Sequence, residues 1–325
     1  MKKTSLIISL ISLLTTGFVA SAQAQTQILT AIPPRLEIKV KPGEFITEKI
    51  QFRNESESTV YLTPILRDFI VSDTAGNPNF VDRQVSGRWA ASSWMNVSPS
   101  SFQAAPNKVV NLSLSVTVPP DALPGGHYAA VLYEAKGSTP ALSGGTSAGS
   151  GINQVVGTLV YITVEGPVTE NAHVKRFEAP GFLEFGPVPF TTEILNSSDI
   201  HLKPQGLITV TNMFGKTVAD LALEERNVFP GASFVYKNTW DTKYLFGRYK
   251  ATLNASYGTG GQMLLATIYF IGFPLRIALA ITLAIVIIIL LIIFFRRHKK
   301  QKELAAELEK IEEEKKTTTE VNPSQ

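Results

Sequence analysis

In residues 108–119, KVVNLSLSVTVP, apolar and polar side chains alternate without interruption from Val110 to Val118. Successive side chains of a β-strand point to opposite faces of the sheet, so a period of two indicates a half-buried antiparallel strand. The apolar face carries Val110, Leu112, Leu114, Val116 and Val118, and the polar face carries Asn111, Ser113, Ser115 and Thr117. This stretch therefore predicts a sheet with one face toward a core.

The same alternation occurs on the N-terminal side of this stretch. It is present in RLEIKV, residues 35–40, and in ITEKIQF, residues 46–52, where Glu48 interrupts the apolar face. Turn signals such as the Pro-Gly-Gly at residues 124–126 separate the stretches, and no long helical pattern precedes residue 277. Short strands with regular turns are typical of β-sandwiches rather than of α/β enzymes, so we expect an all-β fold here.

The N-terminus has the pattern of a secretory signal. Two lysines precede an apolar run over residues 6–20, and the small-residue sequence ASAQA follows at residues 20–24. This order predicts a signal peptide over residues 1–24, cleaved after Ala22 or Ala24. The alternative is an uncleaved anchor, which the shortness of the apolar run and its cleavage-site flanks disfavour.

A second apolar segment, IALAITLAIVIIILLIIFF, begins at Ile277 and ends at Phe295. It has no charge and is about as long as a bilayer core is thick, so it predicts a transmembrane helix over residues 277–295. Five basic residues follow within residues 296–302, and such a cluster is retained on the cytoplasmic side. We therefore expect a single-pass cell-membrane protein with an extracytoplasmic N-terminal ectodomain and a cytoplasmic tail over residues 296–325.

The tail contains a short helical pattern, QKELAAELEKIEEEKK, with one apolar stripe made by Leu304, Leu308 and Ile311. Charge pairs three residues apart support a helix, but the stripe is too short for a secure coiled coil. We expect a solvated helical tail, with a contact to a cytoplasmic partner as the alternative.

Composition excludes several classes of function. The chain has no cysteine, which excludes a disulfide scaffold, a thiol nucleophile, a zinc ribbon and a cysteine-ligated iron–sulfur cluster. An extracytoplasmic chain of this length without cysteine favours a bacterial envelope. The net charge of +3 is small, and the cluster beside the span accounts for part of the basic excess. Nucleic-acid binding is therefore not expected.

The stretch between residues 25 and 270 is long enough for two ordinary domains. FTTEILNSSD at residues 190–199 echoes FITEKIQFRNES at residues 45–56, and FGRYKATLNASY echoes GGHYAAVLYEA. This weak repeat predicts two tandem immunoglobulin-like β-sandwiches, over residues 25–166 and 167–270. Residues 137–152 are rich in glycine and serine and are expected to be a flexible loop within the first sandwich.

Several stretches resemble one known family. IPPRLEIKVKPGEFITEKIQFRNES, LRDFIVSDTAGNPNF, SSWMNVSPSSF and VPPDALPGGHYAAVLYE are similar to the first ectodomain module of WxL-interacting cell-surface proteins of Gram-positive bacteria. ILNSSDIHLKPQGLITVTNMFGKTV, NVFPGASFVY and FGRYKAT, followed by a span and a basic tail, are similar to the rest of that family's layout. The resemblance covers nearly the whole mature chain. It implies a non-enzymatic protein that binds peptidoglycan through the first module and a host or partner surface through the second.

His127 lies directly after the Pro-Gly-Gly turn and at the head of an apolar run. A metal site or a general base needs partner residues nearby, and the other histidines offer none at a suitable spacing. Two glycines suit a tight turn, and the residues that follow alternate as a strand does. We therefore expect a structural role for His127 and no metal or cofactor.

Two other patterns formally match functional motifs. GTSAG at residues 145–149 fits the G-x-S-x-G of hydrolases, but it lies in a low-complexity loop without the strand and helix that the motif needs. DTAGNPNFVD at residues 73–82 carries oxygen ligands for calcium, but its spacing departs from the EF-hand pattern. A polar hairpin loop is the expected role of the second pattern, and no catalytic residue is expected in either.

Aromatic residues are the better candidates for ligand binding, because flat rings hold sugars and peptides. Phe80, Trp89 and Trp94 lie near one another in the sequence and are the predicted ligand-binding residues. A buried sandwich tryptophan is the structural alternative for Trp94. The expected function is adhesion or scaffolding, with cell-wall polymer or other envelope proteins as partners. The alternative is a membrane-tethered assembly or chaperone-like module that captures strands of secreted proteins at an exposed sheet edge.

Overall fold

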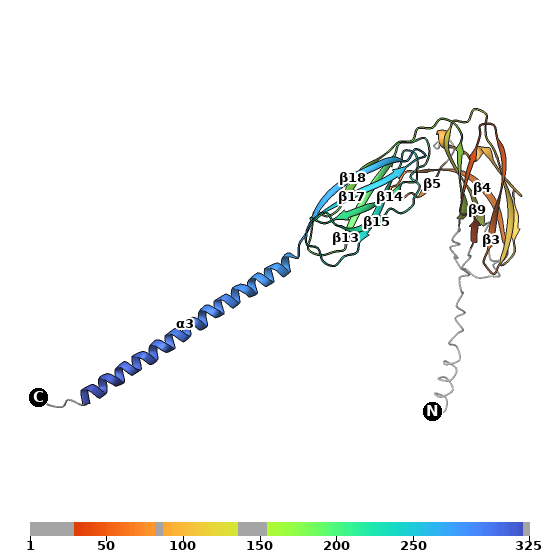
Figure 1. Ribbon diagram of the computed structural model, residues 1–325. Helices are drawn as coiled ribbons and strands as arrows, with labels where there is room; N and C mark the ends of the chain where they lie inside the picture. The colour runs from red at the N-terminus through yellow and green to blue at the C-terminus, as the bar shows by residue number, and fades with distance from the viewer. Residues whose placement is uncertain (1–28, 82–86, 136–154, 321–325) are drawn as a thin grey trace, which may run out of the picture. The chain divides into compact units, whose positions relative to one another are not determined.

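The computed structural model describes residues 29–81, 87–135 and 155–320. The predicted signal peptide, the Gly/Ser-rich loop with its G-x-S-x-G sequence, and Asp82 lie outside these residues. The described chain is mostly β-strand and has one long apolar helix at its C-terminal end (Figure 1). It divides into two compact units, which are described one at a time.

The first unit contains the described residues up to Asn171 together with the short segments Asn196–Leu202 and Phe229–Ala232. Its four-stranded sheet has the order β1-β3-β8-β6, formed by Leu29–Ile32, Phe45–Asn54, Lys108–Thr117 and Met95–Ser98. Its second sheet has the order β2-β10-β9-β4-β5, formed by Arg35–Val40, Val155–Val164, Gly125–Ala135, Val60–Val71 and Pro78–Val81, with β7 (Phe102–Ala104) also on β4. β2 pairs in parallel with β10, and the other pairs of this unit's sheets are antiparallel.

A continuous hydrophobic core joins the two sheets of this unit. Leu112, Leu114 and Val116 of β8 are buried, whereas the polar residues between them are not, which confirms the predicted alternation. Phe52 of β3 packs edge-on against Tyr133 of β9, with the ring centroids 5.1 Å apart, so aromatic residues of both sheets meet in this core. Burial of these apolar side chains is the main favourable contribution to folding.

The second unit also has two sheets. The three-stranded sheet has the order β11-β13-β16, formed by Ala172–Glu178, Val188–Asn196 and Ser233–Trp240. The five-stranded sheet has the order β12-β18-β17-β14-β15, formed by Phe182–Leu183, Gln262–Gly272, Gly247–Tyr257, Gln205–Thr211 and Thr217–Ala222. The rings of Phe190 on β13 and Phe270 on β18, 6.0 Å apart, bring the two sheets together.

Two buried asparagines give the internal repeat a structural meaning. Asn54 at the end of β3 and Asn196 at the end of β13 are both fully buried. The amide oxygen of each accepts a hydrogen bond from the backbone N–H two residues on, at Ser56 and Ser198. The amide nitrogen of each donates to the backbone carbonyl four residues on, at Ser58 and at Ile200. The same side-chain amide therefore closes the turn after the corresponding strand in both repeats.

A single helix, α3 (Leu275–Glu320), ends the described chain. It includes the predicted span and continues without a break through the basic cluster into the tail (Figure 1), whereas the sequence suggested a span and a separate tail helix. The reason is that no glycine or proline lies between Leu275 and Glu320, and lysine, glutamate and alanine propagate a helix well. Within the described residues, α3 is the one helix that is long and apolar enough to cross a membrane.

Candidate functional site

The three predicted ligand-binding aromatics have different surroundings. Trp94, in the short 3-10 turn Ser92–Trp94, packs against the core, and its ring lies 4.5 Å from that of His127. Trp89, in the turn Gly87–Trp89, packs against a cluster that contains Phe69. Phe80 on β5 is 41% exposed, and its ring lies 6.5 Å from that of Phe69. Phe80 and Trp89 thus border the same cluster, whereas Trp94 is half-buried and packs against the core of the first unit.

His127 lies on β9 and is buried. Its Nδ1 is 3.2 Å from the carbonyl oxygen of Ala90, and its Nε2 is 2.9 Å from that of Leu123. Burial lowers the pKa of His127 below its ordinary value, although the two carbonyls oppose that shift. The two contacts link β9 to the backbone at Ala90 and at Leu123. No group of three metal-ligating side chains occurs within the described residues.

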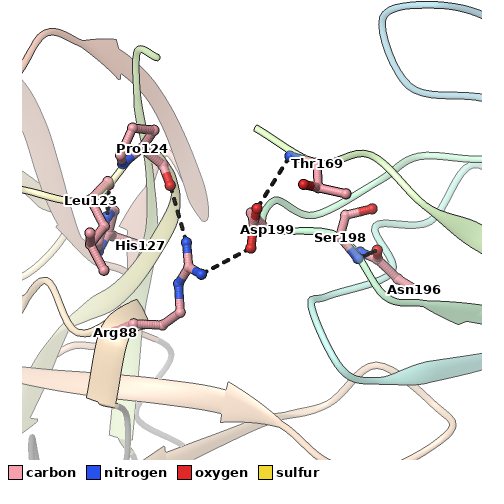
Figure 2. Close-up of polar contacts among 8 residues, drawn as sticks. All are labelled: Arg88, Leu123, Pro124, His127, Thr169, Asn196, Ser198 and Asp199. Atoms are coloured by element: carbon pink, nitrogen blue, oxygen red, sulfur yellow. Dashed lines mark hydrogen bonds and ion pairs between the residues drawn. The ribbon is translucent and has the colours of Figure 1, made fainter. Parts of the chain in front are cut away.

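An ion pair lies beside this histidine. Arg88 donates to the carboxylate of Asp199 at 2.9 Å and to the carbonyl oxygen of Pro124 at 3.2 Å (Figure 2). The second carboxylate oxygen of Asp199 accepts a hydrogen bond from the backbone N–H of Thr169. The backbone carbonyl of Asp199 accepts one from Gly126. Because each charged group also binds a backbone group, the pair attaches the segment Asn196–Leu202 to the rest of the first unit.

The turn that precedes His127 requires glycine for steric reasons. A Cβ atom on Gly125, whose φ is +117°, would meet the backbone of Asp199, and one on Gly126 would meet the phenol oxygen of Tyr128. That phenol oxygen accepts a hydrogen bond from the backbone N–H of His201 at 2.8 Å. Burial strongly raises the pKa of Tyr128, so the phenol stays neutral. The Pro-Gly-Gly-His-Tyr sequence is therefore explained by packing.

The predicted calcium-like loop closes on itself. One carboxylate oxygen of Asp73 accepts hydrogen bonds from the backbone N–H groups of Ala75 and Asn77, and the other accepts one from the Asn77 side chain at 2.6 Å. The loop has the local hydrogen bonding of a polar hairpin.

The strand β18 has a different property, because it is fully paired on one side and almost unpaired on the other. All of its residues have partners in β17, from Gly272 opposite Gly247 to Gln262 opposite Tyr257. On its other side, the described residues pair with it only through β12, at Ile271 and Gly272. β11, which belongs to the other sheet, lies close to β18 without pairing with it. Most of β18 is therefore a sheet edge.

The hydrogen bonds at the end of β18 show which backbone groups face this edge. Ile271 donates its N–H to the carbonyl of Gly181, on the side away from β17. Backbone groups of alternate residues in a strand point in the same direction. The residues two, four, six and eight positions earlier therefore direct their N–H and C=O groups outward. We call these four residues, Met263, Leu265, Thr267 and Tyr269, the β18 edge.

The side chains of the β18 edge are exposed and uncharged. Leu265 is 64% exposed, Met263 is 56% exposed, and β18 contains no charged residue. Each of the other edge strands longer than four residues carries charge: three charged residues on β2 and three on β11, Asp220 on β15 and Lys237 on β16. The edge strands β1, β5 and β6 have four residues each. Proteins commonly protect an edge with charge or shortness, and a long apolar edge is a site for pairing with another chain. Sequence reasoning missed this site, although the uncharged run QMLLATIYFIG, apolar on both faces, was its signal.

Comparisons with known proteins show similarity to solved structures only. No family model matches the chain, and no curated protein matches it. The class 5 fimbriae chaperone CfaA is 14% identical, with 75% of this chain and 99% of that chain covered and a TM-score of 0.39. The E. coli chaperone DraB is 13% identical, with 75% and 95% covered and a TM-score of 0.33. A Porphyromonas gingivalis protein of unknown function is 16% identical, with 75% and 99% covered and a TM-score of 0.27. These values are too low to carry a function over to this chain.

Proposed function

We propose that this chain is a non-enzymatic, membrane-anchored protein that binds other proteins by adding a strand of the partner to the β18 edge. The observation that carries the proposal is a long, uncharged, apolar sheet edge whose outward backbone groups lack a partner strand among the described residues over four alternate residues. This is the strand-capture function that the sequence left as its alternative.

The binding mechanism follows from the geometry of the edge. An extended segment that lies beside β18 forms main-chain hydrogen bonds with the outward N–H and C=O groups, and each contributes a net of roughly 0.5–1.5 kcal/mol. The side chains of Leu265 and Tyr269 extend the apolar face that the segment meets. The guanidinium of Arg248 stacks over the Tyr269 ring at 4.3 Å and holds that ring in place. Affinity therefore comes from the backbone, and preference for apolar partners comes from the side chains.

The proposal includes an architecture and a location. Each pair of sheets is an immunoglobulin-like sandwich, and α3 crosses the cell membrane. The basic residues after Phe295 lie on the cytoplasmic side, and both sandwiches lie outside. Tethering confines the β18 edge to the membrane surface and raises its effective concentration toward partners there. Secreted or envelope proteins with an accessible apolar strand are the expected partners.

The family resemblance supports a second candidate function, which is binding of cell-wall polymer through the first unit. Phe80 is the observation in its favour, because its ring is exposed at the border of an aromatic cluster that also contacts Trp89. Sugar rings bind against such faces. Membership of the WxL-interacting family and peptidoglycan as the polymer remain part of this proposal.

Substitution of the outward amide tests strand capture directly. Thr267→Pro removes an N–H that faces the edge and leaves the ladder to β17 intact, because proline is tolerated on the free side of an edge strand. We expect the full chain with this change to keep its thermal stability within a few degrees. Recovery of crosslinked envelope partners from native membranes should fall by up to about tenfold, since the one hydrogen bond that this N–H donates to the partner strand, worth roughly 0.5–1.5 kcal/mol, is lost.

Thr267→Val is the matched control, because it changes the same side chain and keeps the amide. It should recover partners as the native chain does. In the recovered complex, hydrogen exchange at the four residues of the β18 edge should be slower than in the free chain. Unchanged recovery by Thr267→Pro, or equally fast exchange at the edge in the complex, would rule out strand addition at β18.

A further inference from the structure

The second unit exposes large apolar side chains at one end of its five-stranded sheet. We call this the juxtamembrane end, and it consists of residues 212–216, residues 241–246, β12, and residues 271–274. The pairing of β17 places these segments together, because Gly247 lies opposite Gly272 and Thr211 lies opposite Lys250. A bridge between Phe185 and Tyr244 and the Phe246–Phe273 ring contact at 5.7 Å hold them further.

A link of only two residues connects this end to α3. β18 ends at Gly272 and α3 begins at Leu275, so only Phe273 and Pro274 lie between them. Two residues span at most about 7 Å. The headgroup layer on each side of a bilayer is about 5–8 Å thick, and the apolar part of α3 begins at Ile277. If α3 spans the membrane, the juxtamembrane end therefore lies at the depth of the headgroups.

The exposed side chains of this end suit that depth. Phe214 is 83% exposed, Phe246 is 69% exposed and Tyr244 is 66% exposed, and they lie on two neighbouring loops. Met213 is also exposed beside Gly247, and Phe182 and Ile271 are paired neighbours on β12 and β18. Isolated exposed apolar residues are ordinary, but a cluster of them on loop tips marks an interaction surface. Aromatic rings are preferred at the membrane interface.

The β17–β18 hairpin at the opposite end of the same sheet has no exposed aromatic residue. β17 and β18 are joined there by Gly258, Thr259, Gly260 and Gly261, which carry no large apolar side chain. Residues 212–216 at the juxtamembrane end and residues 258–261 at the opposite end are both hairpin connections of the five-stranded sheet, so such a connection does not require an exposed aromatic residue. The exposed aromatics lie at the end of the sheet where β18 leads into α3, and the hairpin without them lies at the other end of β18.

The basic residues near the juxtamembrane end also favour binding to lipid headgroups. Lys216, Lys243, Arg248, Lys250 and Arg276 lie at or beside the juxtamembrane end, against Asp241 and Glu184, and Glu184 is paired with Arg276 at 3.6 Å. The Lys243 ammonium lies over the Tyr244 ring, 5.3 Å from its centroid. Basic residues beside aromatic rings bind the phosphates of lipid headgroups while the rings enter the interface.

We propose that the juxtamembrane end of the second unit is a lipid-binding surface, with Phe214, Tyr244 and Phe246 inserted among the headgroups of the leaflet from which α3 emerges. The surface adds a second attachment to the membrane and restrains the rotation of the unit about the link to α3. This inference rests on the proposed membrane anchor and is independent of strand capture at the β18 edge.

Single cysteines in this cysteine-free chain test the proposal. The full chain carries Phe214→Cys, Phe246→Cys or, as the control at the opposite end, Gly260→Cys, where the structure has open space. Each is labelled with an environment-sensitive dye and reconstituted at one copy per nanodisc of phosphatidylcholine and phosphatidylglycerol. We expect blue-shifted emission, quenching by lipids with a shallow nitroxide and loss of quenching by aqueous iodide at 214 and 246. The dye at 260 should show no blue shift and no quenching by the nitroxide lipids, and aqueous iodide should quench it. Tyr244→Cys replaces Phe246→Cys if that variant does not fold.

The outcomes separate this inference from the anchor on which it rests. If alkaline carbonate removes the chain from liposomes, α3 is no anchor, and the inference falls with it. If the chain remains in the bilayer but labels at 214 and 246 are as open to iodide as the label at 260, the lipid-binding surface is ruled out and the anchor stands. One copy per nanodisc means that a second copy cannot account for shielding, and quenching by nitroxide lipids distinguishes contact with lipid from contact with the scaffold protein of the disc.

Discussion

His127 shows how a residue with the chemistry of a catalyst serves packing. Both ring nitrogens face backbone carbonyls, at Ala90 and Leu123, and Trp94 packs on the ring. A neutral imidazole has one N–H and can donate to only one of the two carbonyls. Protonation would satisfy both, but burial of the charge costs more, so the pKa of His127 is lowered.

This lowered pKa gives a prediction for stability. In the unfolded chain the imidazole takes up a proton near its ordinary value of about 6.5, whereas the folded chain resists protonation until lower pH. The unfolded state therefore binds more protons below that pH, and the free energy of unfolding falls as the solution becomes more acidic, by at most about 1.4 kcal/mol per pH unit from this group. Thermal unfolding of the first unit should show a lower stability at about pH 5 than at about pH 7. This decrease should be smaller in His127→Gln than in the native chain. An identical loss in both proteins would contradict this account.

At the scale of the element, β8 and β18 differ in how their apolar residues are distributed over the two faces of the strand. β8 alternates strictly, and its buried face carries the core of the first unit. β18 is apolar on both faces, because Leu264 and Phe270 face the core while Met263 and Leu265 face solvent. Periodicity describes β8 completely, but it cannot show that β18 lies at a sheet edge.

The alternation in β8 can be tested with a pair of substitutions on its two faces. Leu114→Ala removes a fully buried side chain and should lower the free energy of unfolding by about 2–5 kcal/mol through lost burial and the cavity left behind. Thr117→Ala on the exposed face should change it by less than about 0.5 kcal/mol. Urea unfolding of the two variants measures both values. Similar losses would mean that β8 has no single buried face.

At the scale of the whole molecule, the proposed span in α3 predicts which part of the chain lies on each side of the membrane. The cysteine-free sequence allows topology to be mapped by single cysteines. A membrane-impermeant maleimide should label Gly260→Cys in intact cells and should label Lys302→Cys only after permeabilisation, because basic residues next to a span stay on the cytoplasmic side. Labelling of Lys302→Cys in intact cells would reverse the proposed orientation.

The division of the chain into units is also a property of the whole molecule. The repeat around Asn54 and Asn196 was visible in the sequence, and the same side-chain hydrogen bonds occur in both copies. The assignment of Asn196–Leu202 and Phe229–Ala232 to the first unit was not visible. Tyr128 contacts the ring of Phe229 at 5.0 Å and binds the backbone of His201, and contacts between residues so distant in sequence leave no local pattern.

The sequence by itself determined the mostly-β character and the apolar helix, because alternation and the length of an apolar run are local properties. It also suggested the turns, since glycine and proline restrict the backbone wherever they occur. Only the tertiary structure decided which strand has one side without a partner strand among the described residues, and which loops lie together beside α3. Sheet order and strand register set those features, and both depend on hydrogen bonds between residues far apart in the chain.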